Sequence, residues 1–132
     1  MTDKVMLFAD FVPGQQLALV EDRITDEQLA EWAQLYPWDK PRGGFVPTGL
    51  TTVLLMRSYH KSIPHRPPGN IHAGQKMQLH APVRSGEAVT TEVACLSAER
   101  KGERRKLELS VHGSGEDGRT VYTGLITLFW AA

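Results

Sequence analysis

The segment from Thr48 to Tyr59 constrains the fold more than any other part of the sequence. It carries apolar or small side chains on nearly every side until Arg57. A helix of this kind is buried on most of its sides, whereas a surface helix keeps a polar face. Thr and Val are poor helix formers, so a strand is the alternative interpretation of the same residues. We predict a buried central helix over residues 48–59.

A second helix is predicted to begin after Thr25 and to end at Pro37. Thr25 can cap this helix while Gln28 reaches back to the cap residue, which is the pattern of a capping box. Acidic residues occupy the first turn, where the helix dipole favours negative charge. No clear element precedes Ile24, and we expect only a short entry segment there.

The second half of the chain has the pattern of strands joined by turns. Apolar residues alternate with polar ones in most of it, and the last segment is apolar on both faces. Glycines at 102, 115 and 118 mark hairpin turns. Strands grouped after helices predict one antiparallel α+β domain over residues 1–132. The segments predicted as strands are 71–80, 88–98, 106–112 and 120–130.

Charge and cysteine content exclude some classes of protein. Lys plus Arg and Asp plus Glu number 15 each, so the formal net charge is zero. This balance gives no general attraction to nucleic acid or to an anionic membrane, and neither is expected as a partner. Cys95 is the only cysteine, so no internal disulfide can form and a reducing compartment fits. No stretch reaches the length of a membrane span, and a cytoplasmic location is expected.

Several short motifs follow one another along the chain. They are Phe11-Val12-Pro13-Gly14-Gln15, Asp39-Lys40-Pro41, Gly44-Phe45-Val46-Pro47-Thr48-Gly49, Ile71-His72-Ala73-Gly74-Gln75 and Pro82-Val83-Arg84-Ser85-Gly86-Glu87. Taken in order, these motifs resemble the MaoC-like hydratase and dehydratase family of hot-dog proteins. The segment that begins at Ile71 is similar to the N-terminal hot-dog units of acyl dehydratases. The resemblance implies a single hot-dog fold, in which an antiparallel sheet wraps around a long central helix.

The resemblance also implies which residues form the site. It places a catalytic Asp at Asp39, on the loop before the central helix, but Arg42 and Gly43 stand where the family has its His. Water addition to an enoyl thioester needs both a proton acceptor and a proton donor, so the dyad is incomplete. The backbone amide at the start of the central helix is the implied donor to the thioester oxygen. The implied substrate-binding residues are Phe45, Thr48, Gly49, His72 and Gln75.

Three functions are compatible with this pattern. The leading hypothesis is an acyl-thioester-binding relative of the (R)-specific enoyl-CoA or acyl-carrier hydratases and dehydratases, with a narrow tunnel beside residues 39–50. The second is a non-catalytic subunit that shapes the acyl tunnel of a heteromeric dehydratase. The third is a hot-dog acyl-CoA thioesterase with Asp39 or Glu87 as its base. Whether the chain alone is an active hydro-lyase stays open. The expected partner is a second hot-dog chain, in a homodimer or heterodimer, and no cofactor is expected besides the thioester substrate.

Histidines and a basic run provide further candidates. A partner subunit's His60, His65 or His72 could replace the missing base. A metal site is not expected, because His72 and His80 would lie roughly 26 Å apart along one strand. The cationic run over residues 99–106 is expected to be a solvated hairpin end, and contact with coenzyme A phosphates is the alternative.

Overall fold

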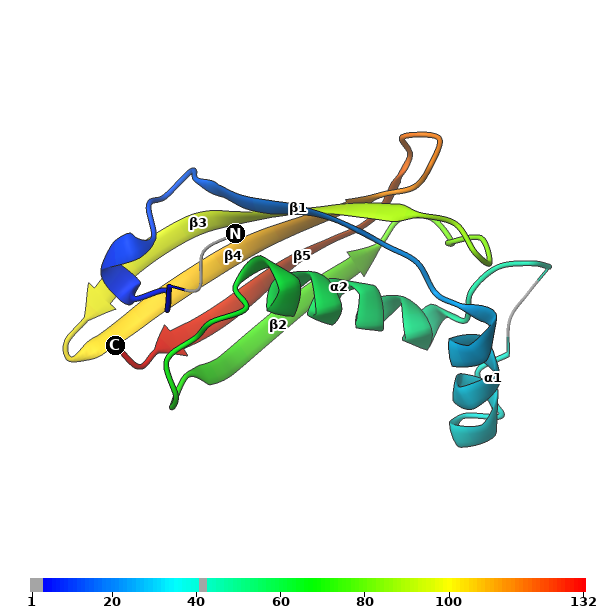
Figure 1. Cartoon of the computed structure of the whole chain (residues 1–132), viewed down its shortest axis with the longest axis horizontal. Helices are drawn as coiled ribbons and strands as arrows, with labels where there is room; N and C mark the ends of the chain where they lie inside the picture. The colour runs from blue at the N-terminus through cyan, green and yellow to red at the C-terminus, as the bar shows by residue number, and fades with distance from the viewer. Residues whose placement is uncertain (1–3, 41–42) are drawn as a thin grey trace.

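The computed structural model describes residues 4–40 and 43–132, which form a curved antiparallel sheet around a helix (Figure 1). The strand order in the sheet is β1-β3-β4-β5-β2, and all neighbours are antiparallel. The predicted α+β architecture is confirmed. The elements in chain order are the 3-10 helix η1 (Phe8–Asp10), β1 (Gln16–Asp22), α1 (Asp26–Leu35), α2 (Thr48–Ser62), β2 (Ile71–Leu79), β3 (Val89–Lys101), β4 (Arg104–Ser114) and β5 (Thr120–Trp130).

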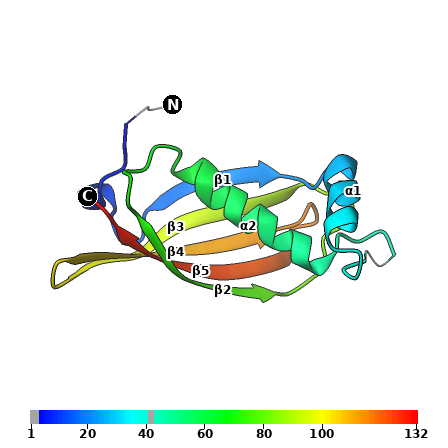
Figure 2. The same cartoon turned by 90° about the horizontal axis from the view of Figure 1, so that it is seen from below.

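Helix α2 crosses the concave face of the sheet, as the view from below shows (Figure 2). Leu54 and Leu55 are 0% exposed, and each contributes about 1.5–3 kcal/mol through burial. Ser58 is also fully buried, and its hydroxyl donates to the carbonyl of Leu54 at 2.7 Å. The predicted central helix is therefore confirmed and runs to Ser62. The strand alternative is wrong.

Helix α1 has the predicted capping box and lies beyond one end of the sheet (Figure 1). The Thr25 hydroxyl accepts from the backbone of Gln28 at 3.2 Å, and the Gln28 side chain accepts from the backbone of Thr25 at 3.0 Å. None of the residues of α1 is fully buried. The helix therefore packs against the rest of the protein only through partly buried side chains such as Leu29 and Trp32.

The prediction of a mere entry segment before Ile24 is wrong, because β1 lies there. Of its seven residues only Val20 is buried, so the alternation that marks other strands is absent. Strand β1 lies at one edge of the sheet and pairs with β3 alone. Backbone pairing to β3, rather than a buried face, defines this strand.

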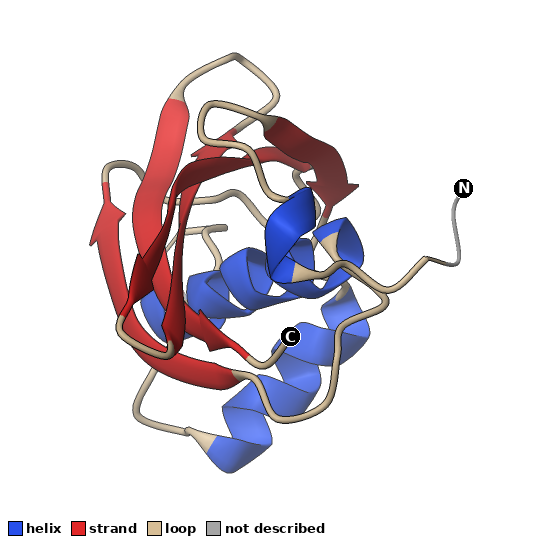
Figure 3. Cartoon of the chain, turned by 90° about the vertical axis from the view of Figure 1, so that its left-hand side faces the viewer, coloured by secondary structure: helices blue, strands red, loops and turns tan. Residues whose placement is uncertain are grey.

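The four strands of the second half are confirmed, and the sheet curls around a helix (Figure 3). Strand β5 lies between β4 and β2, in the interior of the sheet. Gly113 of β4 is paired with Tyr122 of β5, and the buried Tyr122 ring lies over this glycine. The Tyr122 hydroxyl is hydrogen-bonded to the hydroxyl of Thr91, also buried. Cys95 is buried as well.

Strand β2 forms the other edge of the sheet. It pairs with β5 on one side, and no strand of the described residues pairs with its other side. Ile71 and Leu79, at its two ends, are 59% and 43% exposed. The edge is thus available to a further strand. In the described ranges, 4–40 and 43–132, no helix is long and apolar enough to cross a membrane.

Candidate functional site

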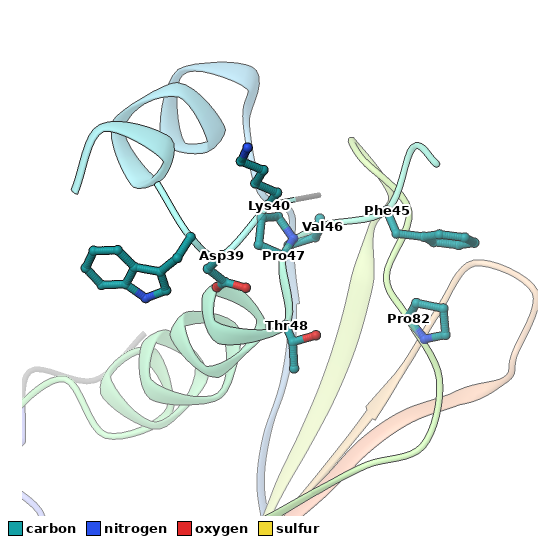
Figure 4. A pocket seen from close by; sticks show the side chains of 8 residues that line it. Asp39, Lys40, Phe45, Val46, Pro47, Thr48 and Pro82 are labelled. Carbon is teal, nitrogen blue, oxygen red and sulfur yellow. The ribbon is translucent and has the colours of Figure 1, made fainter. Parts of the chain in front are cut away.

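A pocket of about 650 Å³ lies at the amino end of α2 (Figure 4). Three of the predicted site residues line it, namely Asp39, Phe45 and Thr48. Their neighbours are mostly apolar, so the pocket has the character of a site for an apolar group with a few polar contacts. The remaining lining residues are Trp38, Lys40, Val46, Pro47 and Pro82.

One wall of the pocket is the segment that leads into α2. The backbone of Val46 donates to the carbonyl of Val83 at 2.7 Å, and the backbone of Ser85 donates to the carbonyl of Gly44 at 2.8 Å. Gly44 has a φ of 83°, a left-handed conformation that favours glycine. These contacts hold Phe45 and Pro82 on the same side of the pocket, as Figure 4 shows.

The carboxylate of Asp39, on the loop that precedes helix α2, caps this helix. Its Oδ2 accepts from the Gly49 backbone amide at 3.1 Å and from the Trp32 indole nitrogen at 2.9 Å. The cap residue of α2 is Pro47, and its side chain makes no capping hydrogen bond. Asp39 therefore supplies the acceptor that Pro47 lacks, and its negative charge suits the amino end of the helix.

This contact occupies the amide that the resemblance implies for the thioester oxygen. A Cβ atom on Gly49 would lie 2.7 Å from Asp39 Oδ2 and 2.9 Å from Trp32 Cζ2, so the close approach requires glycine. A thioester oxygen can accept from this amide only if the Asp39 carboxylate moves away. No pattern in the sequence indicates the hydrogen bond from Trp32 to Asp39.

No imidazole lines the Asp39 pocket in the part of the chain that the structure describes. His80 lines an adjoining pocket of about 270 Å³, and its Nε2 is hydrogen-bonded to the Thr123 hydroxyl at 2.9 Å. Arg42, which stands at the family's His position, lies outside the described residues. Within one chain, the described residues thus provide Asp39 with no His partner.

The other two predicted site residues lie elsewhere on β2. His72 lines a separate pocket at the opposite end of α2, and its ring centroid lies 6.3 Å from that of Tyr59. Gln75 is exposed in the middle of β2 and is paired with Ile126. The structure therefore brings Asp39, Phe45, Thr48 and Gly49 together but does not bring His72 or Gln75 to them within one chain.

Glu87, considered above as an alternative base, is a buried structural residue. Its two carboxylate oxygens each lie 2.7 Å from a guanidinium nitrogen of Arg119, and its side chain is only 2% exposed. Backbone amides of Arg84 and Glu116 also donate to it at 2.9 Å. The Arg119 hydrogen bonds, supported by these amides, lower the pKa of Glu87 from 4.5 to about 2. A carboxylate with every oxygen paired is a poor proton acceptor, so this geometry argues against Glu87 as a base.

Replacing Asp39 with alanine is expected to lower the free energy of unfolding by about 1 kcal/mol, the usual value of a helix cap. The Gly49 amide and the Trp32 indole would both lose their acceptor. Urea denaturation of the variant measures this change. Lys40→Ala is the matched control, because Lys40 is an exposed neighbour in the same loop, and a change below about 0.5 kcal/mol is expected for it. Equal stability of the two variants would contradict the capping role.

No family model and no curated protein matches this sequence. Solved structures do match over most of the chain. The unliganded R-hydratase PhaJ1 from Pseudomonas aeruginosa superimposes with a TM-score of 0.77 and 18% identity, over 94% of this chain and 84% of that one. A MaoC-like dehydratase from Rhodospirillum rubrum gives a TM-score of 0.73 and 15% identity, over 96% of this chain and 99% of that one.

The ChsH1–ChsH2 complex from Mycobacterium tuberculosis is similar too, with a TM-score of 0.70 and 15% identity over 91% of this chain and 98% of the matched one. Thioesterases are also among the similar structures. The chain has the hot-dog fold of the MaoC-like dehydratases and R-hydratases. The resemblance noted in the sequence is thereby confirmed at the level of the fold.

Proposed function

We propose that this chain binds an acyl thioester at the amino end of α2 and acts as a non-catalytic subunit beside another hot-dog chain. The chemistry would then belong to the partner, while this chain would shape part of the acyl site. The proposal combines the fold of the MaoC-like dehydratases with the arrangement around Asp39. It keeps the cytoplasmic location expected from the sequence.

The walls of the Asp39 pocket support acyl binding. Phe45, Val46 and Pro82 offer an apolar surface, and the Thr48 hydroxyl adds a polar group beside the start of the helix. A volume of about 650 Å³ is within the usual range for a small-molecule site. An acyl chain is apolar and its thioester carbonyl is a hydrogen-bond acceptor, so both ends of such a ligand have a suitable neighbour.

One observation supports the non-catalytic role more than any other. The Asp39 carboxylate is already engaged in hydrogen bonds within the protein. Its Oδ2 holds both the Gly49 amide and the Trp32 indole, and the described lining residues include no imidazole. Hydration needs a group that takes a proton from water and a second group that delivers one to carbon. Of these two groups, the described residues around the pocket offer at most the one that takes a proton from water, namely Asp39.

The free edge of β2 supports pairing with another hot-dog chain. An edge strand of nine residues with exposed Ile71 and Leu79 can accept a further strand through backbone hydrogen bonds. Complexes of two different chains occur among the similar structures, such as ChsH1–ChsH2. We place the partner at this edge, and a second copy of this chain is the other candidate for the same position.

A binding assay and a turnover assay with crotonyl-CoA test the proposal. The purified chain alone is expected to bind this thioester saturably in calorimetry and to leave its enoyl absorbance unchanged. Phe45→Asp is expected to abolish binding, because it places a charge on the apolar wall. Leu96→Asp is the matched control on an exposed part of β3, where Leu96 is 55% exposed, and it should bind like the unmodified chain.

Other outcomes separate the remaining functions. Hydration at about 1 s⁻¹ or faster, lost in Asp39→Asn, would make the chain a hydratase in its own right. That second candidate is favoured by the position of Asp39, whose Oδ1 accepts no hydrogen bond from the described residues. Release of free thiol would indicate a thioesterase. Absence of saturable binding would contradict the acyl-binding proposal itself.

A further inference from the structure

A third pocket, of about 380 Å³, lies between the carboxyl end of α2 and the beginning of β2. We call it the Arg66 pocket. Gly49 and His60 are 11 residues apart on α2, which corresponds to roughly 17 Å along the helix axis. The Arg66 pocket is therefore distinct from the Asp39 pocket. Its polar side chains come from α2, from the following loop and from β2, and they are Tyr59, His60, Arg66, Asn70 and His72.

These side chains concentrate positive charge at one place. The Arg66 guanidinium lies 5.4 Å from the centroid of the Tyr59 ring, and no carboxylate of the described residues forms an ion pair with it. Among residues 4–40 and 43–132, none of those that line the pocket is acidic. The pKa of His60 is lowered by burial and then by the charges of Arg66 and His72. A bound anion would relieve this repulsion.

Asn70 adds a hydrogen-bond donor that has no acceptor. Its Oδ1 accepts from the Ala131 backbone at 2.7 Å, which fixes the orientation of the amide group. Its Nδ2 is buried and makes no hydrogen bond with the described residues. An unpaired buried donor costs about 1–3 kcal/mol. A ligand oxygen that reached Nδ2 after a small movement of its neighbours would remove that cost.

We propose that the Arg66 pocket binds the phosphate group of a phosphate ester. A guanidinium, two imidazoles and an amide are donors, and phosphate oxygens are acceptors. The carboxyl end of α2 opposes an anion, but with about half an elementary charge it is outweighed by the full charge of Arg66. A phosphate group presents more acceptor oxygens than a carboxylate to these converging donors, so it suits the site better. The inference goes beyond the proposed function, because it concerns a different pocket.

The groups around His60 provide a second readout of binding. His60 faces Arg66 from the loop, His72 from β2 and Tyr59 on its own helix. Burial and, after it, the charges of Arg66 and His72 hold the pKa of His60 below its ordinary value. A bound phosphate would offset these charges, so it is expected to raise the pKa of His60, which nuclear magnetic resonance of the imidazole measures.

Calorimetric titration of the full chain with inorganic phosphate, pyrophosphate and acetate at constant ionic strength tests the proposal. At pH 7, phosphate and pyrophosphate should bind saturably, and acetate should bind more weakly. Arg66→Gln is expected to weaken phosphate binding by about tenfold or more. His72→Ala, which removes a donor from the other wall of the pocket, should also weaken phosphate binding, and it serves as the second variant if Arg66→Gln does not fold.

Arg100→Gln is the matched control, because it removes the same charge from the exposed β3–β4 hairpin. It should bind phosphate like the unmodified chain. Equal weakening by Arg100→Gln and Arg66→Gln would overturn the proposal in favour of the basic hairpin. Acetate binding as tight as phosphate binding, or no saturable phosphate binding at pH 7, would overturn it as well.

Discussion

Replacing Glu87 with glutamine is expected to lower the free energy of unfolding by about 3 kcal/mol, as is usual when one partner of a buried ion pair is removed. Glutamine keeps the shape of the side chain but offers Arg119 only one oxygen and no charge. Both Glu87 oxygens now lie 2.7 Å from the Arg119 guanidinium, and two backbone amides complete their hydrogen bonds. Denaturation in urea at pH 7 measures the change.

The pH dependence of stability provides an independent check on Glu87. Its folded-state pKa of about 2 lies below its ordinary value of 4.5, so its contribution is fully present above pH 4.5 and is lost as the pH falls toward 2. This difference corresponds to about 3 kcal/mol. Between pH 4.5 and pH 2, the free energy of unfolding of Glu87→Gln should therefore fall less than that of the unmodified chain.

Asp117→Asn is the control for Glu87→Gln, because Asp117 also pairs with Arg119 but is 51% exposed. This replacement should lower the free energy of unfolding by less than about 1 kcal/mol.

Replacing Gly113 with alanine is expected to destabilise the protein by about 3 kcal/mol or more, at the upper end of the cost of overpacking. A Cβ atom at this position would lie 2.6 Å from Cζ and 2.8 Å from Cδ1 of the Tyr122 ring. The ring is completely buried and its hydroxyl is held by Thr91, so it has no room to turn aside. Thermal and urea denaturation measure the effect.

Gly74→Ala is the matched control for Gly113. Gly74 is also a strand glycine, but a Cβ atom there would make an ordinary contact of 3.8 Å with Thr127. An added methyl group with room to fit stabilises slightly or has no effect, because it reduces the freedom of the unfolded chain. Comparable losses at the two positions would mean that the Tyr122 ring does not lie over Gly113.

The elements with a marked apolar pattern could be predicted from the sequence. The segment over residues 48–59 is apolar on nearly every side, and it became the central helix α2. The segments that became β2, β3 and β4 alternate, and the segment that became β5 is apolar on both faces. Strand β1 could not be predicted in this way, because it buries only Val20 and depends on pairing with β3.

The composition of the site was only partly predictable. Asp39, Phe45, Thr48 and Gly49 are close in sequence, so any turn before a helix brings them together. The role of Asp39 as a cap depends on Trp32 from another helix and on the missing acceptor at Pro47, and no local pattern reveals either. His72 was assigned to the same site by a motif, whereas the structure places it beside Arg66 at the far end of α2.

In the proposed thioester site, the acidic side chain of Asp39 is engaged in holding the helix terminus. This arrangement also explains why Gly49 is a glycine, since any larger residue would push Asp39 and Trp32 apart. Under the proposed function, the amide of Gly49 is bound by Asp39, whereas a hydratase that used this amide for catalysis would have to keep it free.

Nuclear magnetic resonance of Asp39→Ala tests this contact most directly. Two signals should move together relative to the unmodified chain, the backbone amide of Gly49 and the indole N–H of Trp32, because both donate to Asp39 Oδ2. The indole signal of Trp38, a side chain that is 77% exposed, is the internal reference and should move less than either. If the Gly49 and Trp32 signals stay in place, Asp39 does not hold the start of α2, and its carboxylate is free for catalysis.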